Sequence, residues 1–133
     1  MASQPLILIV DDVRDNREGY AEYLRFRGFR VLEAGTGNEA LEIAQRCHPD
    51  VIVLDMRLPD ISGTEVSRRL RAAGGFERTT IVAVSACVSP ADVGAAIENG
   101  CDSFLSKPCL PDALVNEINR LLAGHPQKYS RAC

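Results

Sequence analysis

Five polar side chains in this sequence are of the types that together bind a divalent cation and a phosphoryl group. They lie at the ends of four separate apolar runs, and they are Asp11 and Asp12, Asp55, Ser85, and Lys107. Three carboxylates supply the oxygen ligands that Mg²⁺ prefers. A lysine amine and a serine hydroxyl donate to phosphoryl oxygens, and an aspartate can be the nucleophile that forms an aspartyl phosphate. If these residues meet in space, the sequence indicates metal-dependent phosphoryl chemistry.

The apolar runs that precede these residues have the length and composition of buried strands. They span residues 6–10, 51–54, 81–84 and 103–106, and a further short strand is expected at 30–34. Runs of this kind are typical of a parallel sheet that is covered on both faces. In such a sheet the ligand site lies beyond the carboxyl ends of the strands. We therefore expect the acids, the hydroxyl and the amine to meet at one edge of the sheet.

Helical patterns separate the expected strands, and several of them carry start signals. Asp15 with Glu18, and Thr36 with Glu39, have the spacing of a capping box. Ser89 can cap a helix with its hydroxyl group, and the next residue, Pro90, suits the first helical position. Strands that alternate with helices, five of each, predict an α/β doubly wound fold, because right-handed crossovers place helices on both faces of the sheet.

The composition argues against several other classes of protein. The chain has 133 residues, a net charge of -3 and 46% hydrophobic residues, as expected for one globular domain. It contains no basic run, no apolar stretch near the roughly 18 residues of a membrane span, and no pattern of a secretory signal. The five cysteines form no CxxC pair, so reduced thiols are expected. We expect a cytoplasmic protein that binds neither nucleic acid directly nor a membrane.

Taken together, these motifs resemble the receiver domain of two-component response regulators. The segments and residues that carry the resemblance are Val10-Asp11-Asp12, Leu54-Asp55, Pro59, Gly63, Val84-Ser85-Ala86 and Lys107-Pro108. The resemblance extends from about Leu6 to Leu122. We therefore expect residues 1–133 to form a single receiver domain, with its core at 6–122 and a flexible tail at 123–133.

The resemblance implies a flavodoxin-like fold with five parallel strands in the order 2-1-3-4-5. It also implies that Asp55 accepts a phosphoryl group from a sensor histidine kinase or a histidine phosphotransfer protein, while Lys107 and Ser85 contact that group. Such a domain is not an enzyme in the ordinary sense, because it catalyses only its own phosphorylation and dephosphorylation.

The resemblance further implies a metal site and a switch. The expected Mg²⁺ ligands are Asp11, Asp12, Asp55 and the backbone carbonyl of Arg57. On phosphorylation Ser85 would move toward the phosphoryl group, and Phe104 would turn inward behind it. The surface of the fourth helix, fifth strand and fifth helix would then change its affinity for a downstream protein target. The Lys107–Pro108 bond is expected to be cis, as is common in such folds.

Three other functions fit this sequence less well than a phosphorylated receiver domain does. A pseudo-receiver, used only for protein contacts, should lack some of the acids or the lysine, and this chain has them all. A flavodoxin needs a hydroxyl-rich phosphate loop after the first strand, where this chain has Asp11 and Asp12. A phosphatase with an aspartate nucleophile needs a second acid two residues later, where this chain has Arg57.

The sequence does not choose between a stand-alone regulator and a receiver excised from a larger protein. Only about ten residues follow the last expected helix, so DNA binding through a separate module is not expected of the chain as given.

Overall fold

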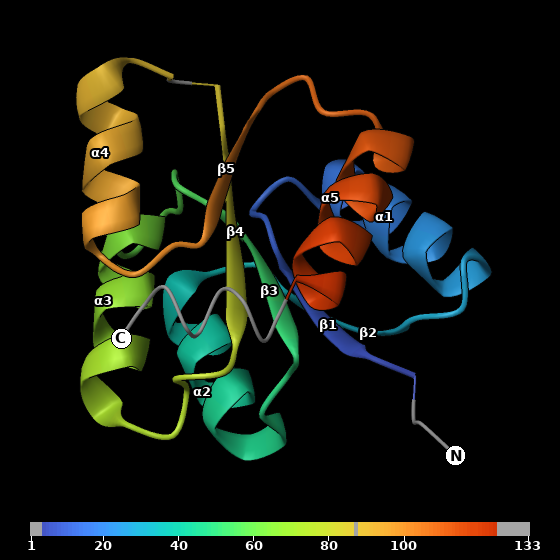
Figure 1. The fold of residues 1–133 in the computed structure, drawn as a ribbon, viewed down its shortest axis with the longest axis horizontal. Coiled ribbons are helices and arrows are strands. Elements are labelled where there is room, and N and C mark those ends of the chain that lie inside the picture. The colour runs from blue at the N-terminus through green and yellow to red at the C-terminus, as the bar shows by residue number, and fades with distance from the viewer. Residues whose placement is uncertain (1–3, 87, 125–133) are drawn as a thin grey trace.

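The computed structural model describes residues 4–86 and 88–124, which form an α/β fold around a five-stranded parallel sheet (Figure 1). The strands are β1 (Leu6–Val10), β2 (Arg30–Ala34), β3 (Val51–Asp55), β4 (Thr80–Ser85) and β5 (Ser103–Ser106). They are ordered β2-β1-β3-β4-β5. The flavodoxin-like order 2-1-3-4-5 and the doubly wound class are therefore confirmed.

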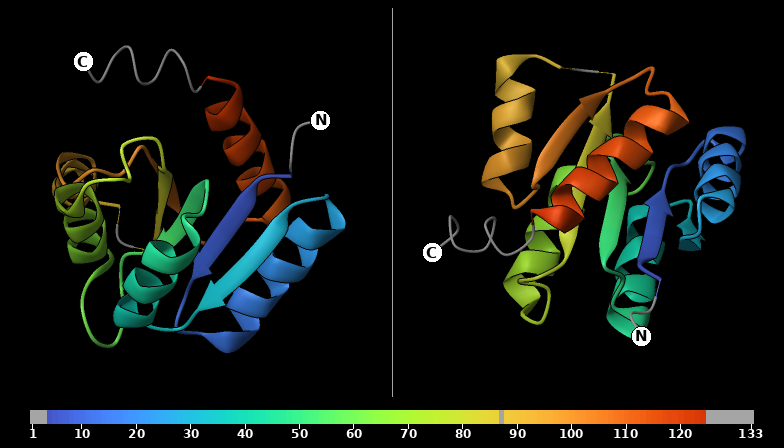
Figure 2. Two further views of the ribbon diagram at one scale, coloured as in Figure 1. Left: turned by 90° about the horizontal axis from the view of Figure 1, so that it is seen from below. Right: turned by 45° about the vertical axis from the view of Figure 1, so that its right-hand side comes forward.

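Five helices cover the two faces of this sheet (Figures 1 and 2). They are α1 (Arg14–Phe26), α2 (Gly37–Cys47), α3 (Gly63–Ala73), α4 (Pro90–Glu98) and α5 (Pro111–Ala123). Helices α1 and α5 lie on one face, and α2, α3 and α4 lie on the other. Within the described ranges, no helix is both long and apolar enough to cross a bilayer. Ala123, the first residue of the expected tail, is helical, and residues 125–133 lie outside the described part.

The core consists of two apolar layers that the central strands separate. In β1, Leu8 and Val10 pack in the layer beneath α2, α3 and α4, whereas Ile7 and Ile9 pack beneath α1 and α5. All five residues of β3 and all six of β4 are buried. A shift of one residue along such a strand would exchange the two layers, so the register is strongly fixed. The carboxyl ends of these strands are therefore held in place relative to one another.

Two of the predicted helix starts agree with the structure in whole or in part. The Ser89 side chain accepts from the backbone N–H of Asp92, with Pro90 as the first helical residue. The Thr36 hydroxyl accepts from the backbone N–H of Glu39 at 3.1 Å. The Glu39 carboxylate, however, accepts from the N–H of Gly35 at 2.7 Å. The Glu39 half of the capping box therefore acts one residue earlier than predicted.

The capping box predicted at Asp15 and Glu18 was wrong. Helix α1 begins at Arg14, and Val13 occupies the position before it without a side-chain cap. Asp15 therefore lies inside the first turn, where its charge favours the positive end of the helix dipole. Glu18 instead accepts from Nε of Arg14 at 2.8 Å, because residues four apart share one helix face.

The strand order reverses direction between β1 and β3. From β1 the chain crosses to β2 on one side and then to β3 on the other. Ligands of doubly wound folds bind at the carboxyl edge where this reversal occurs. The register pairs Val10 with Leu54 and Ser85 with Ser106, so β1, β3, β4 and β5 end at about the same height in the sheet. The residues that follow these strands therefore lie along one edge. The predicted site residues all lie at or beside this edge.

Candidate functional site

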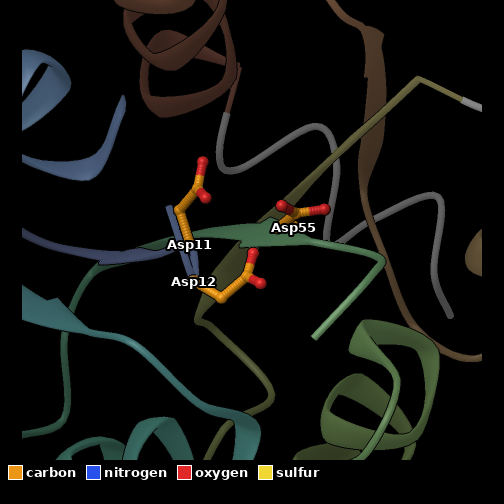
Figure 3. Close-up of side chains that lie close together, drawn as sticks. All are labelled: Asp11, Asp12 and Asp55. Atoms are coloured by element: carbon orange, nitrogen blue, oxygen red, sulfur yellow. The ribbon is translucent and has the colours of Figure 1, made fainter. Parts of the chain in front are cut away.

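Three carboxylates gather at the carboxyl edge of the sheet. Asp11 and Asp12 follow β1 and Asp55 ends β3, and one oxygen of each lies within 4.8 Å of the other two (Figure 3). Asp11 and Asp55 are only 3% and 6% exposed, whereas Asp12 is exposed. Carboxylates this close repel one another unless a proton or a cation intervenes. The cluster therefore favours a bound positive charge, with access from the side of Asp12.

Backbone donors hold one oxygen of each buried carboxylate. Oδ1 of Asp11 accepts from the N–H of Val13 at 2.9 Å. Oδ1 of Asp55 accepts from the N–H of Arg57 at 3.0 Å. Both bonds lie within a tight local turn, two residues along the chain from the acid. They fix the orientation of the carboxylates and leave their Oδ2 atoms directed elsewhere.

Those Oδ2 atoms face the amine of Lys107, which follows β5. Its Nζ lies 3.0 Å from Oδ2 of Asp55 and 3.5 Å from Oδ2 of Asp11. Partial burial by itself lowers the pKa of the Lys107 amine. The hydrogen bond to Asp55 and the charges of Asp55 and Asp11 outweigh this effect, so the net pKa of Lys107 is raised. The backbone N–H of Lys107 donates to the carbonyl of Ser85 at 2.9 Å, which ties its segment to the end of β4. The Lys107–Pro108 bond is cis, as expected.

The donor set of this cluster fits Mg²⁺. Magnesium binds oxygens at about 2.0–2.1 Å, which places neighbouring ligands about 2.9 Å and opposite ligands about 4.2 Å apart. The oxygens of Asp11, Asp12 and Asp55 already lie within 4.8 Å of one another, so small side-chain rotations close the gap. All three donors are carboxylates, and the exposure of Asp12 leaves room for the waters that Mg²⁺ retains.

A second group of predicted residues lines a hollow beside the cluster. Ser85 and Phe104 share a cavity of about 260 Å³ with Arg57 and Thr64, and α4 contributes to its wall. Ser85 is buried at the end of β4, and Phe104 is half-buried on β5 against the core. Ser85 and Phe104, which the resemblance to receiver domains pairs as a switch, therefore border one space next to Asp55.

The backbone of α3 approaches Asp55 more closely than any side chain would permit. Gly63, the first residue of α3, donates its N–H to the carbonyl of Met56 at 3.0 Å. A Cβ atom at this position would lie 2.4 Å from the backbone oxygen of Asp55 and 2.8 Å from Cα of Met56. Gly63 is therefore required for close packing, and this explains a glycine that the sequence motif marks without a reason.

Sequence reasoning missed Asp60, which anchors the loop between β3 and α3. Its two carboxylate oxygens accept from the N–H groups of Gly37 and Asn38 at 2.8 Å each, at the start of α2. The bond from Asn38 and that from Gly37 lower the pKa of Asp60 to about 2. An acid that caps a helix more than twenty residues earlier leaves no local pattern, so only the fold could identify it.

The fold and the site together define a doubly wound α/β domain with an acid-and-lysine site at its topological switch point. Residues 7–119 match the family model of the response regulator receiver domain, and the chain belongs to this family. Receiver domains are the signalling domains of two-component systems, in which phosphorylation controls the response. The predicted family membership is thus confirmed.

Known relatives and solved structures agree with this assignment. The chain is 39% identical to the response regulator MprA of Mycobacterium leprae over 87% of its own length and 50% of that protein, so it spans about half of this relative. It is 28% identical to the polar-differentiation response regulator DivK of Brucella ovis, covering 87% of this chain and 94% of DivK. A CheY-like receiver domain from Methanospirillum hungatei superposes with a TM-score of 0.87 at 25% identity, covering 95% and 99% of the two chains. The chemotaxis protein CheY4 of Vibrio cholerae gives 0.85 at 29% identity, covering 89% and 98%.

Proposed function

We propose that this domain is a signalling switch in which Asp55 accepts a phosphoryl group in a Mg²⁺-dependent reaction. The observation that carries the proposal is the convergence of Lys107 and two further acids on the Asp55 carboxylate. Lys107 Nζ lies 3.0 Å from Oδ2 of Asp55, and the oxygens of Asp11 and Asp12 lie within 4.8 Å. The phosphoryl donor is a phosphohistidine on a sensor histidine kinase or a histidine phosphotransfer protein.

The metal ligands in this proposal are Asp11, Asp12, Asp55 and the backbone carbonyl of Arg57. When bound, Mg²⁺ supplies positive charge that stabilises the charge developing on the phosphoryl oxygens. The protein contributes orientation, because Val13 and Arg57 each hold one oxygen of a buried carboxylate through a backbone N–H.

Oδ2 of Asp55 is the proposed nucleophile. It attacks the phosphorus of the phosphohistidine, so that an O–P bond forms and the N–P bond breaks. The electron pair leaves with the imidazole nitrogen, which takes up a proton from solvent. Lys107 neutralises Asp55 before the transfer and then ion-pairs with an oxygen of the phosphoryl group. The buried Ser85 hydroxyl donates to another phosphoryl oxygen.

Ser85 and Phe104 couple this event to the surface in our proposal. A phosphoryl group carries a charge of about -1.5 to -2, and it draws Ser85 toward itself. The hollow that Ser85 and Phe104 share then admits the aromatic ring. Residues of α4 form part of the same wall, so the surface of α4, β5 and α5 changes its affinity for a downstream protein.

The proposal is tested by incubating the protein with Mg²⁺ and acetyl phosphate and measuring its intact mass. We expect a gain of one phosphoryl group that Asp55→Asn abolishes and that EDTA prevents. Asp15→Asn is the matched control, because Asp15 is an exposed acid in the first turn of α1 and should leave the gain intact. Wild-type protein that gains no mass with either a small donor or a phosphohistidine donor would contradict the proposal and favour a pseudo-receiver.

A further inference from the structure

The geometry points to Arg17 as a positioning residue that, together with Glu33, holds the peptide between Asp11 and Asp12 in the orientation needed to bind Mg²⁺. This inference rests on the proposed function, and it adds two residues that no part of the sequence motif marks. Arg17 lies in α1 and Glu33 lies in β2, on the side of the site away from Lys107 and Ser85.

The guanidinium of Arg17 makes two directed contacts. Its Nη1 donates to the backbone carbonyl of Asp11 at 2.9 Å, and its Nε donates to Oε1 of Glu33 at 3.2 Å. The side chains of Arg17 and Glu33 are only 18% and 26% exposed. A guanidinium is planar and rigid, so fixing Nε on one acceptor also fixes where Nη1 points. Arg17 therefore links β2 to the turn after β1 and fixes the position of that turn relative to β2.

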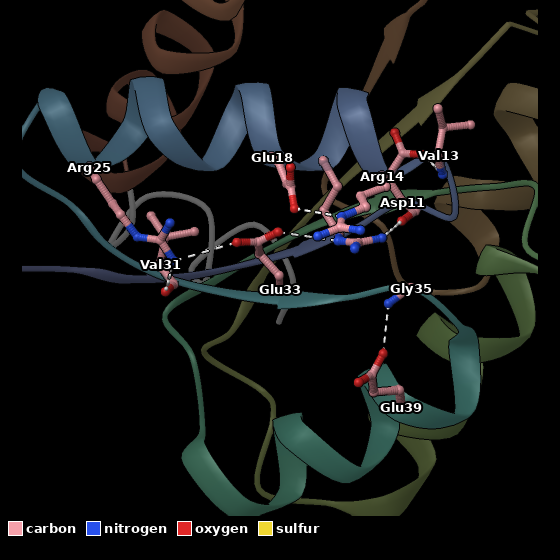
Figure 4. Close-up of polar contacts among 10 residues, drawn as sticks. Asp11, Val13, Arg14, Glu18, Arg25, Val31, Glu33, Gly35 and Glu39 are labelled. Carbon is pink, nitrogen blue, oxygen red and sulfur yellow. Dashed lines mark hydrogen bonds and ion pairs between the residues drawn. The ribbon is translucent and has the colours of Figure 1, made fainter.

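Glu33 is itself held in place. It sits in β2 opposite Ile9 of β1, and Nη2 of Arg25 lies 3.6 Å from its second oxygen. Arg25 also donates to the carbonyl of Val31 at 3.0 Å. Figure 4 shows Glu33 beneath helix α1, between Arg25 and Asp11. The anchor of Arg17 is thus a side chain on a strand of the central sheet and not a mobile surface group.

The carbonyl that Arg17 contacts belongs to the peptide that joins the two acids. The N–H of Asp11 is fixed by the carbonyl of Ala34 at 3.1 Å, which extends the β1–β2 ladder. The carboxylate of Asp11 is fixed by the N–H of Val13. The direction of the Asp11–Asp12 peptide depends in addition on its carbonyl, and rotation of this peptide moves the backbone from which the exposed Asp12 side chain extends.

Charge balance allows an arginine to act beside a cation site. An isolated guanidinium there would repel Mg²⁺, but the ion pair with Glu33 offsets its charge. The Arg17–Glu33 pair thus orients the carbonyl of Asp11 without adding a large net positive charge beside the metal site. Glu33→Gln keeps an oxygen acceptor for Nε while removing this compensation, so it separates the two contributions.

Space for the guanidinium comes from Gly35, the first residue after β2. A Cβ atom at Gly35 would lie 3.2 Å from Nη1 of Arg17. The backbone of Gly35 is not in the left-handed region, so alanine is tolerated there apart from this contact. Gly35→Ala therefore shifts the guanidinium by a few tenths of an ångström without removing any group that binds or pairs.

The test measures the Mg²⁺ dissociation constant by isothermal titration calorimetry and the thermal midpoint in EDTA for each variant. We expect Arg17→Met to weaken Mg²⁺ binding about tenfold, as is typical when a group that orients a metal ligand is lost. Arg17→Lys, which keeps the charge but reaches only one acceptor, should recover little of this loss. Gly35→Ala and Glu33→Gln should each weaken binding by a smaller factor.

Arg14→Met is the matched control, because Arg14 lies in the same helix, is 77% exposed and pairs only with Glu18 at 2.8 Å among the contacts described here. It should leave the dissociation constant unchanged. If Arg17→Met lowers the thermal midpoint but binds Mg²⁺ as wild type does, Arg17 merely ties α1 to β2 and the inference is overturned. If Arg17→Met does not fold, equal Mg²⁺ affinities of Arg17→Lys, Gly35→Ala and wild type overturn it instead. Wild-type protein that does not bind Mg²⁺ at all would contradict the proposed function itself.

Discussion

Replacing Gly63 by alanine should move α3 away from Asp55 and impair both stability and phosphorylation. The added Cβ would lie 2.4 Å from the backbone oxygen of Asp55, which is about 1 Å short of ordinary van der Waals contact. Two of the three nearest atoms are backbone, so no side chain can rotate away to relieve the overlap. The chain must shift by roughly the missing 1 Å, which matters because misplacement of this size can cost about a hundredfold in rate.

The expected loss of stability follows from two opposing terms. Overpacking of a well-packed site costs about 1–3 kcal/mol, and the upper end applies because the obstacle is backbone. Alanine returns at most about 1 kcal/mol through its higher helix propensity, because that value applies to a helix interior and Gly63 is the first residue of α3. The net loss is therefore about 2 kcal/mol, which for a domain of this size lowers Tm by about 8 °C.

Thermal unfolding by circular dichroism and the rate of phosphorylation by acetyl phosphate measure the two effects. Gly19→Ala is the matched control, because Gly19 lies inside α1 and a Cβ there meets nothing within 4 Å. Gly19→Ala should be as stable as wild type or slightly more stable, with an unchanged rate. If Gly63→Ala matched Gly19→Ala in both Tm and rate, the close approach of α3 to Asp55 would be refuted.

Three further predictions concern the acids and the lysine of the site and its loop. Lys107→Met removes the cation between two buried carboxylates, so the free energy of unfolding measured by urea titration in EDTA should fall by about 2 kcal/mol. Adding Mg²⁺ should raise the free energy of unfolding of this variant by more than it raises that of wild type. Equal free energies of unfolding for the variant and wild type in EDTA would contradict the pairing. Mg²⁺ at a hundred times its dissociation constant should stabilise wild type by about 2.7 kcal/mol, and Asp12→Asn should lose most of this gain in a thermal shift assay. The folded pKa of Asp60, about 2, lies below its ordinary value of 3.8, so its stabilising effect is complete above pH 3.8 and is lost as the pH falls through about 2. The Tm difference between wild type and Asp60→Asn should accordingly be constant near neutral pH and vanish toward pH 2, and a difference that persists at pH 2 would show that the charge of Asp60 is not responsible.

The sequence was sufficient to predict the fold, because the strands carry their own signals. Four apolar runs end in polar residues of suitable chemistry, and parallel sheets bring such ends together. Asp11, Asp55 and Lys107 do converge, as expected from the strand ends on which they lie and from the strand order that the resemblance to receiver domains implied. The remaining roles of Ser85, Phe104 and the carbonyl of Arg57 stay predictions.

The parts that the sequence did not predict depend on contacts between distant segments or on small shifts in local geometry. Asp60 caps α2 from the loop after β3, and Arg17 reaches Glu33 on another strand, so neither pair has a periodic pattern. The cap predicted at Asp15 was wrong because of a small local shift, since α1 starts two residues earlier than the polar spacing suggests. Such features follow from how the elements pack, and the structure was needed to find them.

The central claim is that the phosphoryl group is carried by Asp55, and the most direct measurement locates it. Protein phosphorylated in the presence of Mg²⁺ is reduced with borohydride, which converts an aspartyl phosphate to homoserine, and its peptides are then sequenced by mass spectrometry. We predict homoserine at position 55 alone, and none when Mg²⁺ is withheld. Homoserine at position 11 or 12 with Asp55 unchanged, or labelling that does not depend on Mg²⁺, would contradict the account.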